Sequence, residues 1–491
     1  MQTKIALLFC ACIAGSFSHV RAQSAPADKS HNPNIVLIFV DDMGYGDLSC
    51  YGATQYKTPN LDLMATQGMR FTNFLSAQAV CSASRAAILT GCYPNRVGIS
   101  GALTPGAKIG LNPEEEIIPE VLKKSHYRTG AIGKWHLGDH REFLPLQQGF
   151  DEYLGLPYSN DMWPVYYDGT PMTAKENSRK FTRPPLSLIE GNEKIREIKT
   201  LDDQSELTTI YTERAVRFIS ENKKNPFFLY VAHSMPHVPL GVSNKFKGKS
   251  EQGMYGDVMM EIDWSVGEIL KTLDKNGLTK NTLVIFTSDN GPWLNFGNHA
   301  GSTGGLREGK GASFEGGQRV PCLIKWPGHI QEGAVCNKLA STIDILPTLA
   351  AITNSPLPAK KIDGVNIIPL LLGDENANPR ESFLYYYRMN SLEAVRKGNW
   401  KLVFAHPGRT YIGFKPGTDG FPGGVDGNFK FEEGLYDLRR DLGERYDVKE
   451  YYPEVVAELK KLADEARLDL GDDIQNIKGQ NQREPGRIFV K

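Results

Sequence analysis

Two acidic pairs, far apart in this chain, could together hold a divalent cation. Asp41-Asp42 follows the apolar run 34–40, and Asp289-Asn290 follows the apolar run 282–286. Adjacent carboxylates repel each other, and a cation placed between them relieves that repulsion. Ligands that are all oxygen favour Ca²⁺ or Mg²⁺ over zinc. Taken alone, the two pairs fit a solvated turn at each strand end equally well.

A third segment combines a candidate nucleophile with a cation. Cys81 and Arg85 are four residues apart in a stretch that looks helical from Ser82 and meets a helix terminator at Gly91, so they would share one face. Cys81 would lie at the helix N-terminus, where anions are favoured. Without other information, a buried structural cysteine and a surface arginine are the more frequent interpretation.

Further lysines and histidines stand where strand-like runs end or where glycines cluster. Each alone is more often structural or solvated, but together with the acidic pairs they supply cations that could bind an anion. They are Lys134 and His136 in 133–138, His233 and His237 in 231–239, and Lys310 in 309–317. Lys134 and His136 would share one face if the preceding strand-like run, 129–132, continued through them.

These segments need a scaffold that brings distant strand ends together. The runs 34–40, 227–231 and 282–286 are apolar without alternation, which is typical of strands buried on both faces. Stretches with helical spacing lie at 58–68, 209–223 and 256–273. This alternation predicts an α/β domain with a mainly parallel sheet, in which ligands bind beyond the carboxyl ends of the strands.

The character of the chain changes after about residue 370. Short strand-like segments lie at 382–387, 393–396 and 400–404, the glycine- and aromatic-rich segment 409–431 is expected to be a loop, and 453–468 is an amphipathic helix. We therefore expect a catalytic domain over 23–370 and a smaller α+β domain over 371–491, with an antiparallel sheet and one helix.

The first 22 residues resemble an export signal. Lys4 precedes the apolar run 5–14, and Val20-Arg21-Ala22 offers a small-residue cleavage site. The apolar run is too short to span a bilayer, and no later stretch is long enough, so a periplasmic or secreted protein without a transmembrane segment is expected. Cys12 offers an alternative, a lipoprotein attachment site, although Phe9 departs from that motif.

Composition narrows the classes of partner. A net charge of -1 gives no electrostatic reason to expect binding to nucleic acid. Five cysteines lie beyond the signal, and an odd number in an exported protein leaves at least one unpaired or modified. Their wide spacing speaks against a zinc site or a disulfide scaffold.

The motifs in their order resemble those of the type I sulfatases, which depend on formylglycine. Residues 81–91 resemble the first signature of that family and 133–138 the second; 287–292, 309–317 and 435–438 resemble further blocks. The likeness extends over 34–447. Gly149-Phe150 followed by 154–159 is similar to the branch of arylsulfatase A and N-acetylgalactosamine 6-sulfatase. This family implies an alkaline-phosphatase-like fold, a large mixed sheet sandwiched by helices.

The resemblance also implies a role for each matching residue. Position 81 would carry formylglycine (3-oxoalanine) made from Cys81, and Arg85 would hold it. Ca²⁺, rather than Mg²⁺, would be bound by an oxygen of that residue together with Asp41, Asp42, Asp289 and Asn290. Lys134 and Lys310 would bind sulfate oxygens, His237 would bind sulfate or protonate the leaving oxygen, His136 would act as the base, and Ser159 would touch the sulfate. His233 has no equivalent in the family.

The implied reaction explains why the cysteine must be modified. One hydroxyl of the hydrated aldehyde attacks sulfur, and deprotonation of the second then expels sulfate; an unmodified Cys81 lacks that second hydroxyl and should be poorly active. Ala83 stands where most family signatures have proline. This variant resembles the bacterial form matured by anaerobic radical enzymes, and such an enzyme is the expected maturation partner.

Two alternatives stay open, and the substrate is only partly defined. A phosphomonoester or phosphonate hydrolase would need similar metal and cationic groups, and a chain that keeps Cys81 as a thiol could be a non-catalytic glycan-binding protein. The branch implies a sulfated carbohydrate as substrate. Candidate contacts to the sugar are His140, Asp161 and His299, which lie in the loops 139–142, 160–163 and 295–302.

Overall fold

The structure is a computed structural model that describes residues 32–173 and 180–488. The predicted export signal, 1–22, lies outside the described residues, and so does the alternative lipid attachment site at Cys12. In the part of the chain that is described, no helix combines the length and the apolar character that crossing a bilayer requires.

A ten-stranded mixed sheet forms the centre of the molecule. Five neighbouring strands in its middle, from β10 to β6, run parallel, and antiparallel pairings flank them on both sides. Across the sheet the strands are β12 (Ala334–Cys336), β2 (Met69–Phe71), β11 (Cys322–Lys325), β10 (Thr282–Ser288), β1 (Asn34–Val40), β9 (Phe227–Ala232), β5 (Arg128–Gly133), β6 (Glu152–Gly155), β7 (Leu186–Glu190) and β8 (Glu193–Ile198). The predicted mixed, mainly parallel sheet is confirmed.

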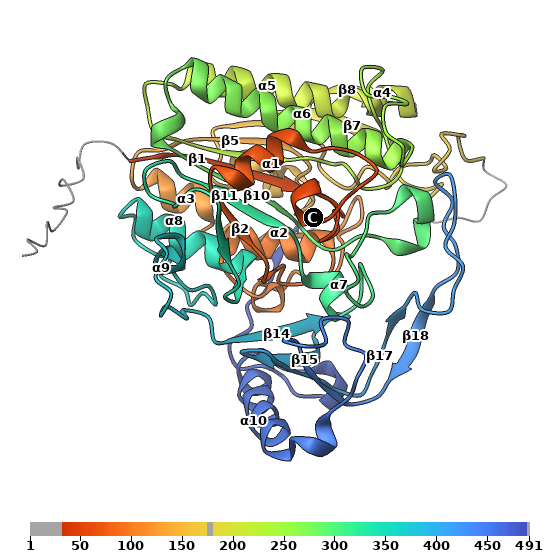
Figure 1. Ribbon diagram of the computed structural model, residues 1–491. Helices are drawn as coiled ribbons and strands as arrows, with labels where there is room; N and C mark the ends of the chain where they lie inside the picture. The colour runs from red at the N-terminus through yellow and green to blue at the C-terminus, as the bar shows by residue number, and fades with distance from the viewer. Residues whose placement is uncertain (1–31, 174–179, 489–491) are drawn as a thin grey trace, which may run out of the picture.

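Helices cover both faces of this sheet (Figure 1). The residues of β1 alternate between two hydrophobic cores: positions 35, 37 and 39 face α2, α3 and α8, whereas positions 36, 38 and 40 face α1, α5 and α6. One layer consists of α2 (Cys81–Thr90), α3 (Ile118–Lys123) and α8 (Ile345–Ile352), and the other of α1 (Pro59–Thr66), α5 (Leu207–Glu221) and α6 (Met254–Lys275). A strand buried on both sides needs apolar residues throughout, which explains the unbroken run 34–40.

A smaller unit follows the large sheet. Its four-stranded antiparallel sheet consists of β14 (Ser382–Tyr387), β15 (Ser391–Lys397), β16 (Trp400–Val403) and β19 (Gly434–Asp437), and α10 (Pro453–Leu470) packs on it. The predicted boundary at residue 370 falls within α9 (Ile368–Leu371), before this sheet begins. The last strand, β20 (Gly486–Arg487), returns to pair with β4 (Ile109–Gly110) of the large domain.

One sequence-based prediction in this region is wrong. The segment 409–431, expected to be a loop, contains the end of β17 (His406–Thr410) and all of β18 (Asp426–Phe431), which pair as an antiparallel hairpin. Most of β18 is exposed, so it lacks the alternation of a half-buried strand. In Figure 1 the hairpin rises along the side of the large domain.

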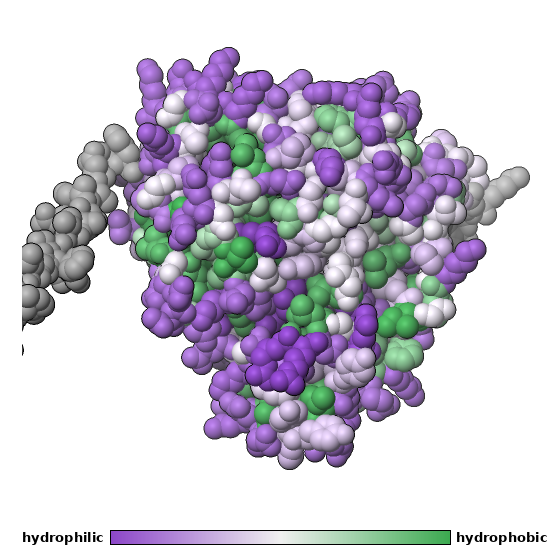
Figure 2. All heavy atoms as spheres, in the orientation of Figure 1, coloured by the Kyte–Doolittle hydropathy of each residue, from purple (hydrophilic) through white to green (hydrophobic). Residues whose placement is uncertain are grey.

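The remaining elements are short. Apart from short 3-10 helices, they are β3 (Phe74–Leu75), which pairs with β13 (Ala340–Ser341), α4 (Leu201–Ser205) and α7 (Glu315–Gln318). On the face drawn in Figure 2, apolar side chains form small separate patches between hydrophilic ones.

Candidate active site

The two predicted acidic pairs meet at the carboxyl ends of neighbouring parallel strands. β1 and β10 pair in register up to Val40 and Ser288, so the residues that follow emerge side by side. The main-chain N–H of Asp42 donates a hydrogen bond to Asp289 Oδ1 at 3.1 Å, and Asn290 Nδ2 donates to Asp42 Oδ1 at 2.7 Å. Residues almost 250 positions apart in sequence therefore form one buried acidic cluster.

Cys81 begins helix α2 beside this cluster, and Gly91 ends that helix in the left-handed conformation. The interpretation of Arg85 as a surface residue is wrong, because its side chain is fully buried. Arg85 Nη2 lies 2.8 Å from Asp289 Oδ2, and Nη1 donates to the main-chain oxygen of Lys134 at 3.1 Å. The arginine thus connects α2 to the ends of β10 and β5.

Two lysines reach the same cluster from separate segments. Lys310 Nζ lies 2.6 Å from Asp42 Oδ1 and 3.2 Å from Cys81 Sγ. Lys134 Nζ is paired with Asp41 and donates to Ser159 Oγ at 3.0 Å. The strand does not continue through Lys134 and His136: β5 ends at Gly133, and His136 has a φ of 59°.

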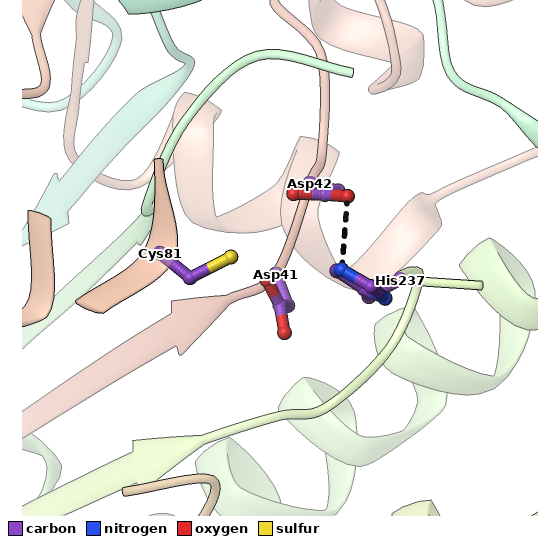
Figure 3. A group of neighbouring side chains, drawn as sticks. All are labelled: Asp41, Asp42, Cys81 and His237. Atoms are coloured by element: carbon purple, nitrogen blue, oxygen red, sulfur yellow. Dashed lines mark ion pairs between the residues drawn. The ribbon is translucent and has the colours of Figure 1, made fainter. Parts of the chain in front are cut away.

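His237 completes a compact group (Figure 3). One potential ligand atom from each of Asp41, Asp42, Cys81 and His237 lies within 4.8 Å of the others. His237 Nε2 is 3.5 Å from Asp42 Oδ2, the pair that the dashed line in Figure 3 marks. Asp289 stands next to this group, and its oxygens accept hydrogen bonds from Arg85 and from the main chain of Asp42.

His136 and His233, the other two histidines of the lysine and histidine motifs, have different surroundings. His136 is buried; its Nε2 is 2.8 Å from the main-chain oxygen of Leu103, and among the described residues its Nδ1 has no partner. Burial, together with the charge of Lys134, lowers the pKa of His136 well below 6.5, so its ring is neutral and able to accept a proton. His233 is also buried, and its Nε2 lies 3.2 Å from Ser265 Oγ.

Burial and charge set the protonation of the acidic and thiol groups. Burial alone would raise the pKa of Asp41, but Lys134 and His237 outweigh it and hold that pKa well below 3.8. Burial, followed by the charge of Asp41, raises the pKa of Asp289 to about 7. Burial also raises the pKa of the Cys81 thiol to about 12, against the effect of Lys134. An unmodified Cys81 would therefore be a protonated thiol rather than a reactive thiolate.

The oxygen atoms of this site suit a hard divalent cation. Asp41 Oδ1 and Asn290 Oδ1 are buried and, within the described part of the chain, accept no hydrogen bond. Unpartnered buried oxygens are costly, and a cation would satisfy both. Asp41, Asp42, Asp289 and Asn290 are the residues that would hold it, and their ligands favour Ca²⁺ or Mg²⁺.

The predicted substrate contacts fall into two groups. Ser159 touches Lys134 and lies inside the site. Asp161 is 8% exposed, and Asn160 beside it donates to the main-chain oxygen of His237 at 3.2 Å. His140 and His299 are half-buried in their loops, and no described contact joins them to the acidic cluster.

Sequence reasoning missed two residues at the site. Trp293 lies three residues after Asn290, with its ring against His237 and Lys310; a large aromatic so soon after the motif was an available signal. Tyr411 Oη donates to the main-chain oxygen of Lys310. Tyr411 comes from the segment expected to be a loop, and no local pattern indicates its partner. None of the five described cysteines forms a disulfide.

Comparisons with known proteins agree with this site. The sulfatase family matches residues 33–355, and the family described as the C-terminal region of aryl-sulfatase matches 378–486. Human arylsulfatase A is 40% identical over 446 residues, which cover 88% of this chain and 87% of the relative. The chain therefore belongs to the sulfatase family and is a sulfuric ester hydrolase.

The relatives also define the branch within that family. Human N-acetylgalactosamine-6-sulfatase is 38% identical, with 84% of this chain and 81% of the relative covered. Together with arylsulfatase A, it places the chain in the branch that these two enzymes represent.

Solved structures show the same architecture. A sulfatase from Pseudoalteromonas sp. superposes with a TM-score of 0.78 at 30% identity, covering 89% of this chain and 90% of that one. A Bacteroides thetaiotaomicron sulfatase from the metabolism of multiple glycosaminoglycans gives a TM-score of 0.74 at 30% identity, covering 89% and 100%. A phosphonate monoester hydrolase of Agrobacterium radiobacter, 19% identical with a TM-score of 0.57, shares the fold alone.

Proposed function

We propose that this chain hydrolyses sulfate monoesters of sulfated carbohydrates, with formylglycine formed from Cys81 as nucleophile and Ca²⁺ as the metal. The observation that carries the proposal is the position of Cys81. It stands at the N-terminus of α2, with the ammonium of Lys310 at 3.2 Å and the carboxylates of Asp41 and Asp42 in the same compact group. The relatives named as sulfatases, one of them from glycosaminoglycan metabolism, support the class of substrate.

A formylglycine at position 81 and a bound metal would each supply specific chemistry. Hydrated formylglycine offers two hydroxyls on one carbon, one to displace the alcohol from sulfur and one whose deprotonation then releases sulfate. Ca²⁺ held by Asp41, Asp42, Asp289 and Asn290 would supply positive charge that stabilises the anionic sulfate.

The residues of the chain perform the binding and the proton transfers. Lys134 and Lys310 donate hydrogen bonds to the sulfate oxygens. Their charges offset the repulsion between the anionic sulfate ester and an anionic nucleophile. His237, beside Asp42, protonates the oxygen of the departing alcohol as the S–O bond breaks. His136, neutral because it is buried, takes the proton from the second hydroxyl. Such proton transfers contribute typically ~10²–10⁴-fold each.

Arg85 orients the nucleophile rather than reacting. Its guanidinium is fixed by Asp289 and by the main chain of Lys134, so it holds the start of α2 at a constant distance from the strand ends. An anaerobic radical maturation enzyme, which the alanine at position 83 suggests, is proposed as the partner that modifies Cys81. Export to the periplasm or beyond is proposed from the first 22 residues.

Mass spectrometry together with an ester assay tests the proposal. The peptide that contains residue 81 should be lighter than its cysteine form by the difference between sulfur and oxygen plus two hydrogens, and the protein should release sulfate from sulfated esters faster than phosphate from phosphorylated ones. Cys81→Ala should lose turnover, whereas Cys50→Ala, a half-buried cysteine elsewhere, should keep it. An unmodified thiol in an active preparation would overturn the formylglycine, and a preference for phosphate would overturn the substrate class.

A further inference from the structure

An aromatic side chain stands next to the groups that would handle the leaving alcohol. The ring of Trp293 lies 5.5 Å from the ring of His237, and the Lys310 ammonium lies 4.7 Å from the centre of the Trp293 ring. Trp293 is half-buried, so part of it remains open to a ligand. The side chain therefore borders the reaction centre on the side of the proposed acid.

A buried aromatic stack fixes the orientation of Trp293. Phe296, which is 1% exposed, contacts it edge to face with ring centres 4.8 Å apart. Tyr167 packs on Phe296 in the same way at 4.9 Å. A ring supported from behind keeps one orientation, so a ligand stacking on it loses little entropy to side-chain ordering.

A carboxylate with an unmet hydrogen bond also interacts electrostatically with His237. Asp161 Oδ1 is buried and has no hydrogen-bond partner among the described residues. The neighbouring Asn160 donates to the main-chain oxygens of His237 and Pro239, each at 3.2 Å, which fixes this segment against the histidine. Trp293 and Asp161 thus offer, near His237, an apolar ring and a carboxylate oxygen that has no donor among the described residues.

We infer that Trp293 is the platform on which the ring of the leaving alcohol stacks, and that the ring is a pyranose whose hydroxyl edge faces Asp161. The inference rests on the proposed hydrolysis of carbohydrate sulfates and names the part of the substrate that the site recognises. A pyranose has one face of C–H groups, which suits an indole, and an edge of hydroxyl donors, which suits a carboxylate. A planar aryl alcohol would use only the platform, and a short acyclic alcohol would use neither.

Three esters and four variants test this inference in the matured enzyme. The esters are N-acetylgalactosamine 6-sulfate, 4-nitrophenyl sulfate and ethyl sulfate, and the readouts are kcat and KM for each. Trp293→Ala should lower kcat/KM for the sugar sulfate about tenfold, mainly through KM, and that for ethyl sulfate less than about twofold. Trp293→Phe should restore most of the loss. Trp264→Ala, a half-buried tryptophan on α6 that packs on Phe246, is the matched control.

The fourth variant distinguishes a pyranose from a flat aromatic ring. Asp161→Asn should lower kcat/KM for the sugar sulfate by a larger factor than kcat/KM for 4-nitrophenyl sulfate. Equal losses on ethyl and sugar sulfates in Trp293→Ala, or no loss on either, would overturn the inference while the sulfatase activity stands. If the wild-type protein released sulfate from none of the three esters, the proposed function would fail and the inference with it.

Discussion

The phenol of Tyr411 donates a hydrogen bond to the main-chain oxygen of Lys310, so the hairpin region after β17 holds a proposed catalytic lysine of the large domain. Arg409 donates to the same oxygen at 3.4 Å. Two residues before Lys310, the carboxylate of Glu308 accepts from Thr410 Oγ1 at 2.6 Å and from the main-chain N–H of Tyr411 at 2.9 Å. The smaller unit therefore fixes the segment that carries Glu308 and Lys310, the lysine loop, at these two residues.

Removing the phenol oxygen should impair catalysis more than folding. Tyr411→Phe loses one hydrogen bond, worth about 1 kcal/mol, and leaves the loop free to shift. We expect kcat to fall about fivefold with the thermal midpoint nearly unchanged, as measured by steady-state kinetics and calorimetry. Tyr446→Phe, on an exposed tyrosine of the same unit, is the control and should change neither value. An unchanged kcat in Tyr411→Phe would contradict the positioning role.

Removal of the metal should lower stability as well as activity. A ligand that binds only the folded state at 100 times its Kd stabilises it by about 2.7 kcal/mol. A chelator should therefore lower the thermal midpoint, and Ca²⁺ should restore it at lower concentration than Mg²⁺. In Asp289→Asn the response should shrink, whereas Asp168→Asn, on an exposed aspartate, should respond like the wild type. A midpoint insensitive to chelation would argue against a bound cation.

A buried ion network that links α7 to the smaller sheet should be sensitive to the loss of one charge. Lys401 Nζ lies 2.7 Å from Glu444 Oε1 and 3.3 Å from Glu315 Oε1, and all three side chains are buried. Lys401→Met leaves a buried carboxylate without its partner, which costs about 3–5 kcal/mol. Denaturant unfolding should show that loss. Lys397→Met, which breaks a half-exposed pair with Glu458, should cost less than about 1 kcal/mol.

Stability should also fall as pH rises through the neutral range, because of Glu393. Burial raises the pKa of this carboxyl to about 8, with Asp472 adding to the effect and Ser313 and Arg388 opposing it. Its neighbour His406, 3.4 Å away, has a pKa lowered by burial to about 4 and stays neutral. The folded state thus keeps a proton that the unfolded chain releases above its own pKa near 4.5.

The sign of the effect follows from that difference in protonation. The contribution of Glu393 is fully present below pH 4.5 and is lost between pH 4.5 and about 8, by up to about 1.4 kcal/mol per pH unit. Unfolding free energies measured across this window in the wild type and in Glu393→Gln should differ in slope, with the variant flatter. Parallel curves would mean that Glu393 is ionised in the folded protein.

The sequence permitted prediction of the elements whose pattern is local. The run 34–40 reproduces β1 at both ends because a strand buried on both faces is apolar throughout. The meeting of Asp41 and Asp289 also followed from sequence, since parallel strands end at the same edge of a sheet. The resemblance to a known family assigned the remaining roles.

Other features depend on contacts that no local pattern carries. Burial of Arg85 requires Asp289 from a distant part of the chain. The sequence around an arginine near a helix start does not distinguish a buried side chain from an exposed one. The turn at His136, with positive φ, breaks a strand whose composition would allow it to continue. The hydrogen bond between Tyr411 and Lys310 joins the two units. The hairpin that positions Tyr411 was not predicted, because its glycine-rich sequence is typical of a loop.

The hydrogen bonds that fix the lysine loop determine when Cys81 becomes buried during synthesis. Cys81 is 2% exposed once Lys310 lies against it and Gly311 is bonded to the main chain of Ala79. The residues that hold this loop, from Arg409 to Tyr411, leave the ribosome long after the cysteine does. We therefore expect the modification proposed for residue 81 to precede the packing of residues 409–411 against this loop.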